Sequence, residues 1–368
     1  MMDFRIDKNS LQRGLYLAHG IADRKGSMPI LANVLIRSEG PDRISFSATD
    51  LKVTVVVSLP AKVEQEGGVT VGARQLFEIA KGLSSDEVLL RRTENNWLEI
   101  KSGRAQFNVV GMSEREYPKI PSVAAAELSP VDSKVLTEMI GKTAFSILQD
   151  DTRPHLASIL FECDGKRACM VSTDGHRLSK VGMDMDSGPR LASGVLIPRK
   201  GVAEIRRILE GRETPSLMGV FQGMLVLRAD DLTLTVKLGE GQFPPYDQVI
   251  PKENDKIVVI EREILLEALR RVSIIASDKT CGIRLALGKG VLTIEADNPD
   301  LGKACEKLDV EYKGSALDIG FNARYFIDVL SEMSSKNVRL ELGENLDPAV
   351  LRPGDDSDYL GVIMPMRL

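Results

Sequence analysis

Residues 196–209 read LIPRKGVAEIRRIL: a short apolar run meets a proline, a basic pair follows, and a helix is predicted to begin. Apolar side chains then recur at helical spacing and mark one face of that helix: Val202, Ile205, Ile208 and Leu209. The same design begins at residue 71 (VGAR) and at residue 321 (FNAR). Arg74, Arg199 and Arg324 are each 125 residues from the next. The chain is therefore an internal triplication.

Other features repeat with the same period. An aspartate follows a short strand-like run in each copy (Asp50, Asp174 and Asp297), and an amphipathic helix opens each copy. An aromatic residue or methionine followed by proline closes each copy: Tyr117-Pro118, Phe243-Pro244 and Met364-Pro365. We expect three domains, 1–125, 126–252 and 253–368, each with two helices and about four times as many strands. That pattern predicts an α+β fold, with helices gathered on antiparallel sheets.

Composition limits the kind of protein. The chain has 368 residues, of which 43% are hydrophobic, enough for three cores. No apolar run approaches the roughly 18 residues of a membrane span, and the N-terminus lacks a signal-peptide pattern, so we predict a cytoplasmic protein. The four cysteines show no CxxC spacing. They are interpreted as reduced packing residues, and no metal or other cofactor is expected.

The charge is unevenly distributed. A net charge of −5 alone would argue against a nucleic-acid partner. The six predicted helical windows, however, hold 18 Lys and Arg against 10 Asp and Glu, a net of +8 that leaves −13 for the rest. These windows are 9–25, 73–83, 133–149, 198–212, 262–279 and 323–336. Basic helices on an acidic body suit a protein that presents one face to phosphate. The alternative is that they are ordinary solvated helix faces.

Catalytic motifs are scarce. Residues 173–178 (TDGHRL) contain an aspartate and a histidine, which together can orient a general base. A hydrolase that uses Asp174 and His176 is therefore one alternative. No GxSxG, HExxH or phosphate-binding glycine loop accompanies them, and there are only three histidines. Because all three copies carry an aspartate at this turn, we interpret it as a turn in which Asp caps backbone amides, and we predict no catalytic site.

Four segments together resemble one family. They are 173–178 (TDGHRL), 197–202 (IPRKGV), 243–246 (FPPY) and 364–368 (MPMRL). They are similar to the bacterial DNA sliding clamp, the beta subunit of the replicative DNA polymerase III holoenzyme, and the resemblance runs from residue 4 to residue 368. It implies a processivity factor that encircles duplex DNA. The expected form is a closed head-to-tail homodimer of six clamp domains, with helices around the hole and sheets outside.

The resemblance also implies site residues. Contacts to double-stranded DNA, independent of its sequence, would come from Arg24, Lys25, Arg74, Lys81, Gln149, Arg153 and Lys200. The dimer interface would join Phe107 and Val109 of one chain to Ile274 and Ile275 of the other. A groove for short linear segments would comprise Leu156, Thr173, Gly175, His176, Arg177, Leu178, Pro244, Val249, Val362, Met364, Pro365, Met366, Arg367 and Leu368. Its partners would be the replicative polymerase, the clamp loader, other polymerases, ligase and mismatch-repair proteins.

The sequence departs from the family at several of these places. Pro154 and His155 stand where some members have two aromatics, Gln248 where some have arginine, and Gly302 and Lys303 where some have acids. A related ring or arc that serves mainly as a repair scaffold is a further alternative. It would keep the groove but could lose closure.

A ring of six such domains would be wide enough to surround duplex DNA. Twelve helices of about 10 Å each would surround a hole roughly 38 Å across, which admits a duplex with water around it. Non-specific binding to phosphates is typically about 10⁻⁴ to 10⁻⁶ M, too weak to retain one DNA for long. Encirclement would supply the retention, and weak basic contacts would permit sliding.

Overall fold

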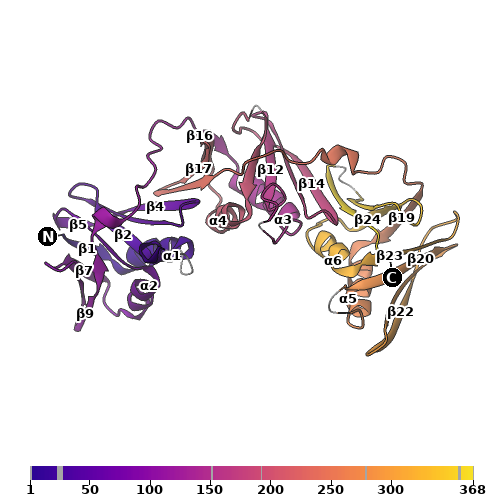
Figure 1. Cartoon of the computed structure of the whole chain (residues 1–368), viewed down its shortest axis with the longest axis horizontal. Helices are drawn as coiled ribbons and strands as arrows, with labels where there is room; N and C mark the ends of the chain where they lie inside the picture. Colours follow the sequence, from indigo (N-terminus) through magenta and orange to yellow (C-terminus); the bar gives the residue numbers. More distant parts are fainter. Residues whose placement is uncertain are drawn as a thin grey trace. The chain divides into compact units, whose positions relative to one another are not determined.

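The computed structural model describes residues 2–22, 28–150, 152–191, 193–277, 280–354 and 358–367. Within these ranges it has six α-helices (Figure 1): α1 (Lys8–Ile21), α2 (Ala73–Gly82), α3 (Ser133–Ala144), α4 (Arg199–Leu209), α5 (Arg262–Ser273) and α6 (Ala323–Ser331). Helices α2, α4 and α6 each follow a strand directly and begin at or one residue before Arg74, Arg199 and Arg324. The predicted triplicate strand-to-helix design is thus confirmed.

Two sheets belong to the first of two compact units, which comprises Met1–Val131, Ala203–Ile208 and Arg212–Leu238. Every strand pair in these sheets is antiparallel. One sheet has the order β5 (Lys62–Gln65), β1 (Asp3–Asp7), β7 (Glu87–Arg92), β8 (Leu98–Ser102) and β9 (Ala105–Val109). The other has the order β10 (Gly111–Met112), β6 (Gly68–Gly72), β2 (Asn33–Ser38), β3 (Arg43–Thr49), β4 (Val53–Pro60), β18 (Leu232–Lys237), β17 (Met224–Ala229), β16 (Ser216–Phe221) and β11 (Ser129–Val131).

The second unit, Asp132–Val202, Leu209–Gly211 and Gly239–Leu368, holds two more antiparallel sheets. The larger has the order β15 (Val195–Pro198), β12 (Ser158–Cys163), β13 (Arg167–Thr173), β14 (Arg177–Asp184), β26 (Tyr359–Ile363), β25 (Ala349–Pro353), β24 (Asn337–Leu342) and β19 (Lys256–Glu261). The smaller has the order β22 (Gly302–Asp309), β21 (Val291–Asn298), β20 (Gly282–Gly288) and β23 (Leu317–Asn322). The predicted α+β class is confirmed.

The sheets continue across the predicted repeats. In the first unit β4 of the first repeat pairs with β18 of the second, so that Val55 lies opposite Leu234. In the second unit β14 pairs with β26 of the third repeat, and Leu178 lies opposite Val362. All four of these side chains are at most 2% exposed. Each junction is therefore a row of backbone hydrogen bonds over buried apolar pairs.

The helices cover the sheets with the predicted apolar faces. On α4, Val202, Ile205, Ile208 and Leu209 are all buried. Helix α1 packs against β3 and β4 and also against α2. Its Gly14 is required by this packing, because a Cβ there would lie 2.9 Å from side-chain atoms of Phe46 and Leu59. The helix can therefore approach the sheet closely at this turn.

Two expectations were wrong in detail. The opening helix of the second repeat, which we expected to run to about Gln149, ends at Ala144. Side chains of the adjacent strands take its last carbonyls: Ser179 Oγ donates to Lys142 O (2.6 Å), and Ser172 Oγ donates to Thr143 O (2.5 Å). These bonds close the helix five residues before the end of the predicted window 133–149.

The aspartate turn differs in the third repeat. Asp50 and Asp174 each accept two backbone N–H bonds, as predicted. In the third copy Asn298 accepts the amide of Asp300 (3.0 Å), whereas Asp297 lies in β21 and pairs with Lys303 (2.5 Å). The capping role has therefore moved by one residue to an amide side chain, which can make the same turn.

Tyr117 fastens the segment that closes the first repeat. Its ring packs with Ile30 and Leu35, and it is 6% exposed. The hydroxyl donates to Asn33 O and accepts from Thr49 N, both at 3.2 Å. Burial raises the pKa of Tyr117 to about 12, because an unsolvated phenolate is unfavourable.

This pKa predicts a loss of stability at high pH. The folded-state pKa lies above the unfolded value of about 10, so the contribution is complete below pH 10 and is lost as the pH rises towards 12. Tyr117→Phe should lower the free energy of unfolding by about 1–2 kcal/mol at pH 8, because it removes both hydrogen bonds. At pH 11 the difference in the free energy of unfolding between wild type and Tyr117→Phe should be smaller by about 1.4 kcal/mol. Urea unfolding at both pH values measures it, and a difference independent of pH would contradict the assignment.

Candidate nucleic-acid interface and partner groove

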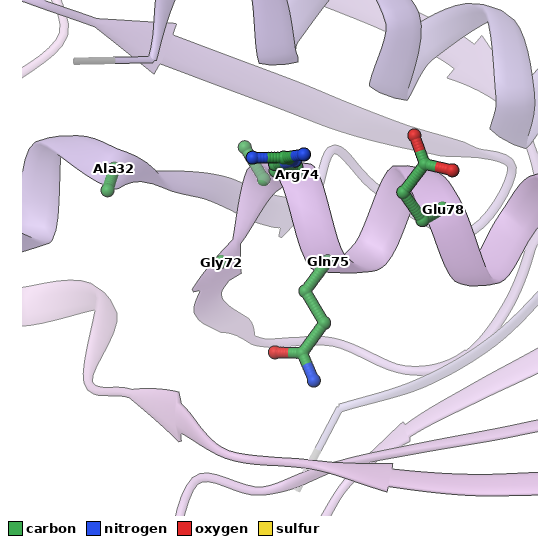
Figure 2. A pocket seen from close by; sticks show the side chains of 6 residues that line it. Ala32, Gly72, Arg74, Gln75 and Glu78 are labelled. Atoms are coloured by element: carbon green, nitrogen blue, oxygen red, sulfur yellow. The ribbon is translucent and has the colours of Figure 1, made fainter. Parts of the chain in front are cut away.

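The first turns of α2, α4 and α6 carry arginine where acidic residues are normally favoured. A helix N-terminus is already partly positive, so a cation there is unfavourable by a few tenths of a kcal/mol to about 1 kcal/mol. None of the three helices has an acid in its first turn. Arg74 is exposed beside a depression of about 390 Å³, with Gln75 and Glu78 on the same helix (Figure 2). A positive helix end with an added cation is suited to phosphate.

The other predicted DNA contacts are mostly exposed. Lys81, in the last turn of α2, lies 3.5 Å from Glu78. Gln149, Arg153 and Lys200 are exposed in the second unit. Arg199 Nη1 donates to the backbone oxygen (2.8 Å) and the side-chain oxygen (2.6 Å) of Gln149, and this brings the start of α4 to the loop after α3. Arg24 and Lys25 lie outside the described residues.

Some helical cations that contributed to the basic surplus are engaged within the protein. The Lys142 side chain is only 8% exposed, pairs with Glu138 at 2.8 Å and lies over the ring of Tyr359. Arg270 pairs with Glu267 at 2.7 Å. The charges of these helix faces are therefore partly neutralised by acidic residues of the same helices. The first-turn arginines are therefore stronger evidence for phosphate binding than the net charge of the helices.

The turn at residues 173–178 is built as a structural turn. Asp174 Oδ1 accepts the backbone amides of His176 (2.9 Å) and Arg177 (3.0 Å). Its Oδ2 accepts from Arg177 Nε at 3.1 Å. Both carboxylate oxygens thus hold the turn and the neighbouring arginine, while the side chain of His176 is exposed. This arrangement disfavours the alternative of a hydrolase in which Asp174 orients the histidine ring.

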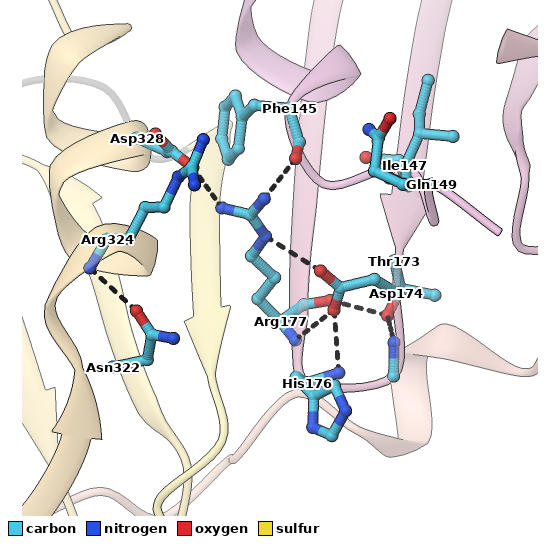
Figure 3. Close-up of polar contacts among 12 residues, drawn as sticks. Phe145, Ile147, Gln149, Thr173, Asp174, His176, Arg177, Asn322, Arg324 and Asp328 are labelled. Atoms are coloured by element: carbon cyan, nitrogen blue, oxygen red, sulfur yellow. Dashed lines mark hydrogen bonds and ion pairs between the residues drawn. The ribbon is translucent and has the colours of Figure 1, made fainter. Parts of the chain in front are cut away.

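Arg177 connects the second repeat to the third. Its side chain is 10% exposed, and its guanidinium bonds Asp174, the Asp328 carboxylate on α6 (2.5 Å) and the carbonyl oxygen of Phe145 just after α3 (Figure 3). It also lies over the rings of Tyr325 (4.6 Å) and Phe145 (5.3 Å). Arg177 was predicted to be a groove residue. Its guanidinium donates hydrogen bonds within the chain and so holds the groove wall in place.

The predicted groove residues differ in how deeply they are buried. Leu156, Leu178 and Val362 are buried, and the last two belong to a core with Leu160, Val171, Leu196, Val350 and Leu360. Half-buried residues are Thr173, Arg177, Pro244, Pro365 and Met366, and exposed ones are Gly175, His176, Val249, Met364 and Arg367. Among the exposed residues, Val249 (41%) and Met364 (36%) offer apolar surface. Leu368 lies outside the described residues.

Val249 and Met364 line one depression of about 690 Å³. Its other walls are residues 247–254, Asp347 and Pro348. Sequence reasoning placed Val249 in the groove and noted Gln248, but it missed the rest of this wall. Asn254 shapes it, because its Nδ2 donates to both Glu341 O and Pro348 O at 3.0 Å. The available sequence signal was the apolar Leu346 within the polar run 344–347, and its side chain is 68% exposed.

The last described segment of the chain is held in place by backbone hydrogen bonds. Strand β26 pairs with β14, and the next backbone amide, that of Met364, donates to His176 O at 2.9 Å. Met366 N donates to Gly320 O at 2.9 Å. These bonds keep the last described residues beside the turn at 173–178.

The four predicted dimer residues differ in exposure. Phe107, on the edge strand β9, is 38% exposed, and Ile274, just after α5, is 73% exposed. Ile275 is half-buried. Val109 is only 4% exposed and lies opposite Leu98, so its side chain already packs in the core of its own unit. Within the single chain, Phe107 and Ile274 therefore offer more contact surface than Val109 does.

The described ranges contain no group of three or more His, Cys, Asp or Glu that could hold a metal ion. Within the same ranges, no helix has both the length and the apolar character needed to cross a membrane.

The linking role of Arg177 predicts a large loss of stability. Arg177→Met should lower the free energy of unfolding by about 2–4 kcal/mol, because Asp174 and Asp328 would keep their charges without a guanidinium. Arg177→Met combined with Asp328→Asn should recover part of that loss. The matched control is Arg284→Met, at an exposed ion pair with Asp318, which should change little. Chemical denaturation measures all three, and equal effects at Arg177 and Arg284 would contradict this role.

Comparisons with known proteins agree with this geometry. The N-terminal, central and C-terminal domain models of the DNA polymerase III beta subunit match residues 2–121, 130–245 and 247–367. The chain is 35% identical over 370 residues to the beta sliding clamp of Pseudomonas aeruginosa, with both chains fully covered. A crystal structure of the beta subunit from that organism superposes with a TM-score of 0.93 at 34% identity, and each chain is fully covered. A Bartonella birtlesii sliding clamp bound to griselimycin gives a TM-score of 0.93 at 30% identity, again over the full length of both. The chain belongs to the DNA polymerase III beta subunit family, the beta sliding clamps.

Proposed function

We propose that two copies of this chain close a ring around duplex DNA and hold replication and repair proteins on it. The observation that carries the proposal is the pairing of strand edges. The first repeat joins the second through β4 and β18, and the second joins the third through β14 and β26. Strand β9 of the first repeat and β22 of the third are edge strands of the two sheets that contain no such junction. A third junction of the same kind needs a second chain, and two head-to-tail junctions close a ring of two.

Exposed apolar residues support this junction. Phe107 lies on β9, and Ile274 follows the helix α5 that packs on β22. In the proposed dimer, Phe107 would pack against Ile274 and Ile275 of the partner subunit. The boundaries 1–125, 126–252 and 253–368 for the three clamp domains are part of the same proposal.

DNA would be held loosely inside the ring. The first-turn arginines, with Lys81, Gln149, Arg153 and Lys200, would meet phosphates without reading bases, and Arg24 and Lys25 would add to them. Contacts of this kind are individually weak and salt-dependent. Retention would come from closure of the ring, and sliding from the weakness of the contacts.

Partner proteins would bind at the depression beside Val249 and Met364. An extended segment can place apolar side chains there, against Val249, Ile250 and the flexible side chain of Met364. We propose the replicative polymerase, the clamp loader, other polymerases, ligase and mismatch-repair proteins as users of this groove. Micromolar affinity, about −8 kcal/mol, would let them exchange. The protein would act in the cytoplasm, on the nucleoid.

The dimer interface can be tested by a single substitution that introduces a charge. Phe107→Asp should give monomers, because a carboxylate buried without a partner is costly. The matched control is Val259→Asp on the edge strand β19, which is more exposed (56%) but lies outside the proposed junction, so this variant should remain dimeric. Sedimentation equilibrium measures both. Dimerisation of Phe107→Asp with unchanged affinity would contradict the interface.

The groove can be tested without disturbing the ring. Val249→Ala combined with Met364→Ala removes exposed apolar surface and should weaken binding of a polymerase segment about tenfold or more. The length of DNA made per binding event should fall accordingly, while dimerisation stays unchanged. Ile264→Ala, at another half-exposed apolar side chain, is the control. If the double variant supports full-length synthesis, the groove lies elsewhere.

A further inference from the structure

Three aromatic rings form a cluster at the surface of α1 and α2. The ring centroids of His19 and Phe77 are 4.9 Å apart in a stacked arrangement, and Tyr16 lies 6.0 Å from Phe77 and 6.4 Å from His19. Tyr16 is 48% exposed, whereas His19 and Phe77 are partly exposed. The two helices pack side by side in the first unit (Figure 1). We call these three residues the aromatic patch.

Two cations lie over the rings of the aromatic patch. Lys81 Nζ is 5.2 Å from the centroid of Phe77, and the Arg207 guanidinium is 5.3 Å from that of Tyr16. Arg207 is fixed there, because it donates to Tyr16 O (3.3 Å) and Leu17 O (3.1 Å). A Cβ at Gly20 would lie 2.9 Å from this guanidinium, so the glycine gives it room. The patch therefore combines aromatic surface with positioned positive charge.

The fold itself does not need this exposed surface. The core face of α1 is made by Leu11, Leu15, Ala18 and Ile21, all fully buried, and the ring of Tyr16 lies outside that stripe. Glu78 and Glu204 balance the charges of Lys81 and Arg207, so the patch is not a strong phosphate site by charge alone. Its distinctive chemistry is stacking between aromatic rings and cations, and this suits a flat ligand that carries negative charge.

We propose that the aromatic patch binds single-stranded DNA, with an unpaired base stacked on the exposed ring of Tyr16 and phosphates beside Lys81 and Arg207. The inference rests on the proposed function in one respect, namely that α1 and α2 face the DNA. Bases inside a duplex present only their edges, so they cannot stack on these rings, whereas unpaired bases can. The patch would therefore contact the unpaired template next to a duplex, independently of sequence.

The test compares two DNA forms on the full-length protein. Fluorescence anisotropy would measure binding of a labelled 20-nucleotide oligo-dT and of a 20-base-pair duplex at low salt. Tyr16→Leu should weaken oligo-dT binding about fivefold to a hundredfold, the range expected for one lost base stack, and leave duplex binding unchanged. Tyr16→Phe keeps the ring and should bind like wild type. Trp97→Leu, at an exposed ring (42%) on a distant hairpin turn, is the matched control and should change neither.

A second measurement does not depend on a substitution. Oligonucleotides containing 5-iododeoxyuridine, crosslinked by light and mapped by mass spectrometry, should attach to Tyr16 or Phe77. The proposal is overturned if wild type does not bind oligo-dT, if Tyr16→Leu weakens both DNA forms equally, or if crosslinks map elsewhere. Failure of the ring proposal would appear separately, as equal retention on circular and linear duplex, and would not alter these readouts.

Discussion

An unpaired strand edge exposes a row of backbone N–H and C=O groups, and this protein deals with that exposure by joining one repeat to the next. The β4–β18 and β14–β26 pairs turn four edges into the interiors of two sheets. Buried apolar pairs such as Leu178 and Val362 line these junctions and set their register. The same solution, applied between chains at β9 and β22, explains why a protein with three repeats would assemble as a pair.

The helices depend on those sheets for their positions. Each of α2, α4 and α6 begins where a strand ends, so the sheets determine where the first-turn arginines lie. Placing a cation at a positive helix end costs stability. Arg199 is bonded to Gln149, whereas Arg74 and Arg324 are exposed, which favours a role outside the fold for these two. At the groove, Arg177 and Asn254 have a positioning role. Each uses its hydrogen-bond donors to hold a wall that a partner segment would meet.

Local features were predictable from the sequence, because they depend on neighbouring residues. The helix starts, the hairpins at residues 98–109 and 224–237 and the buried strand β26 follow from periodicity, turn residues and an apolar run. Distant partners were not predictable. Arg177 and Asp328 are 151 residues apart, and no local sequence pattern predicts their ion pair. The early end of α3 has the same origin, since strand side chains far along the chain take its carbonyls. Val109 is buried although Phe107, two residues away on the same face of β9, is exposed, so alternation along the strand does not predict this difference.

Retention by closure separates this protein from one that simply adheres to DNA. The protein should be loaded on a nicked circular duplex at physiological salt, and the fraction bound should be followed after a single-site enzyme linearises the circle. The proposed ring predicts that bound protein persists on the circle and leaves within minutes once free ends exist. Equal persistence on circular and linear DNA would contradict encirclement and leave ordinary phosphate binding as the means of attachment.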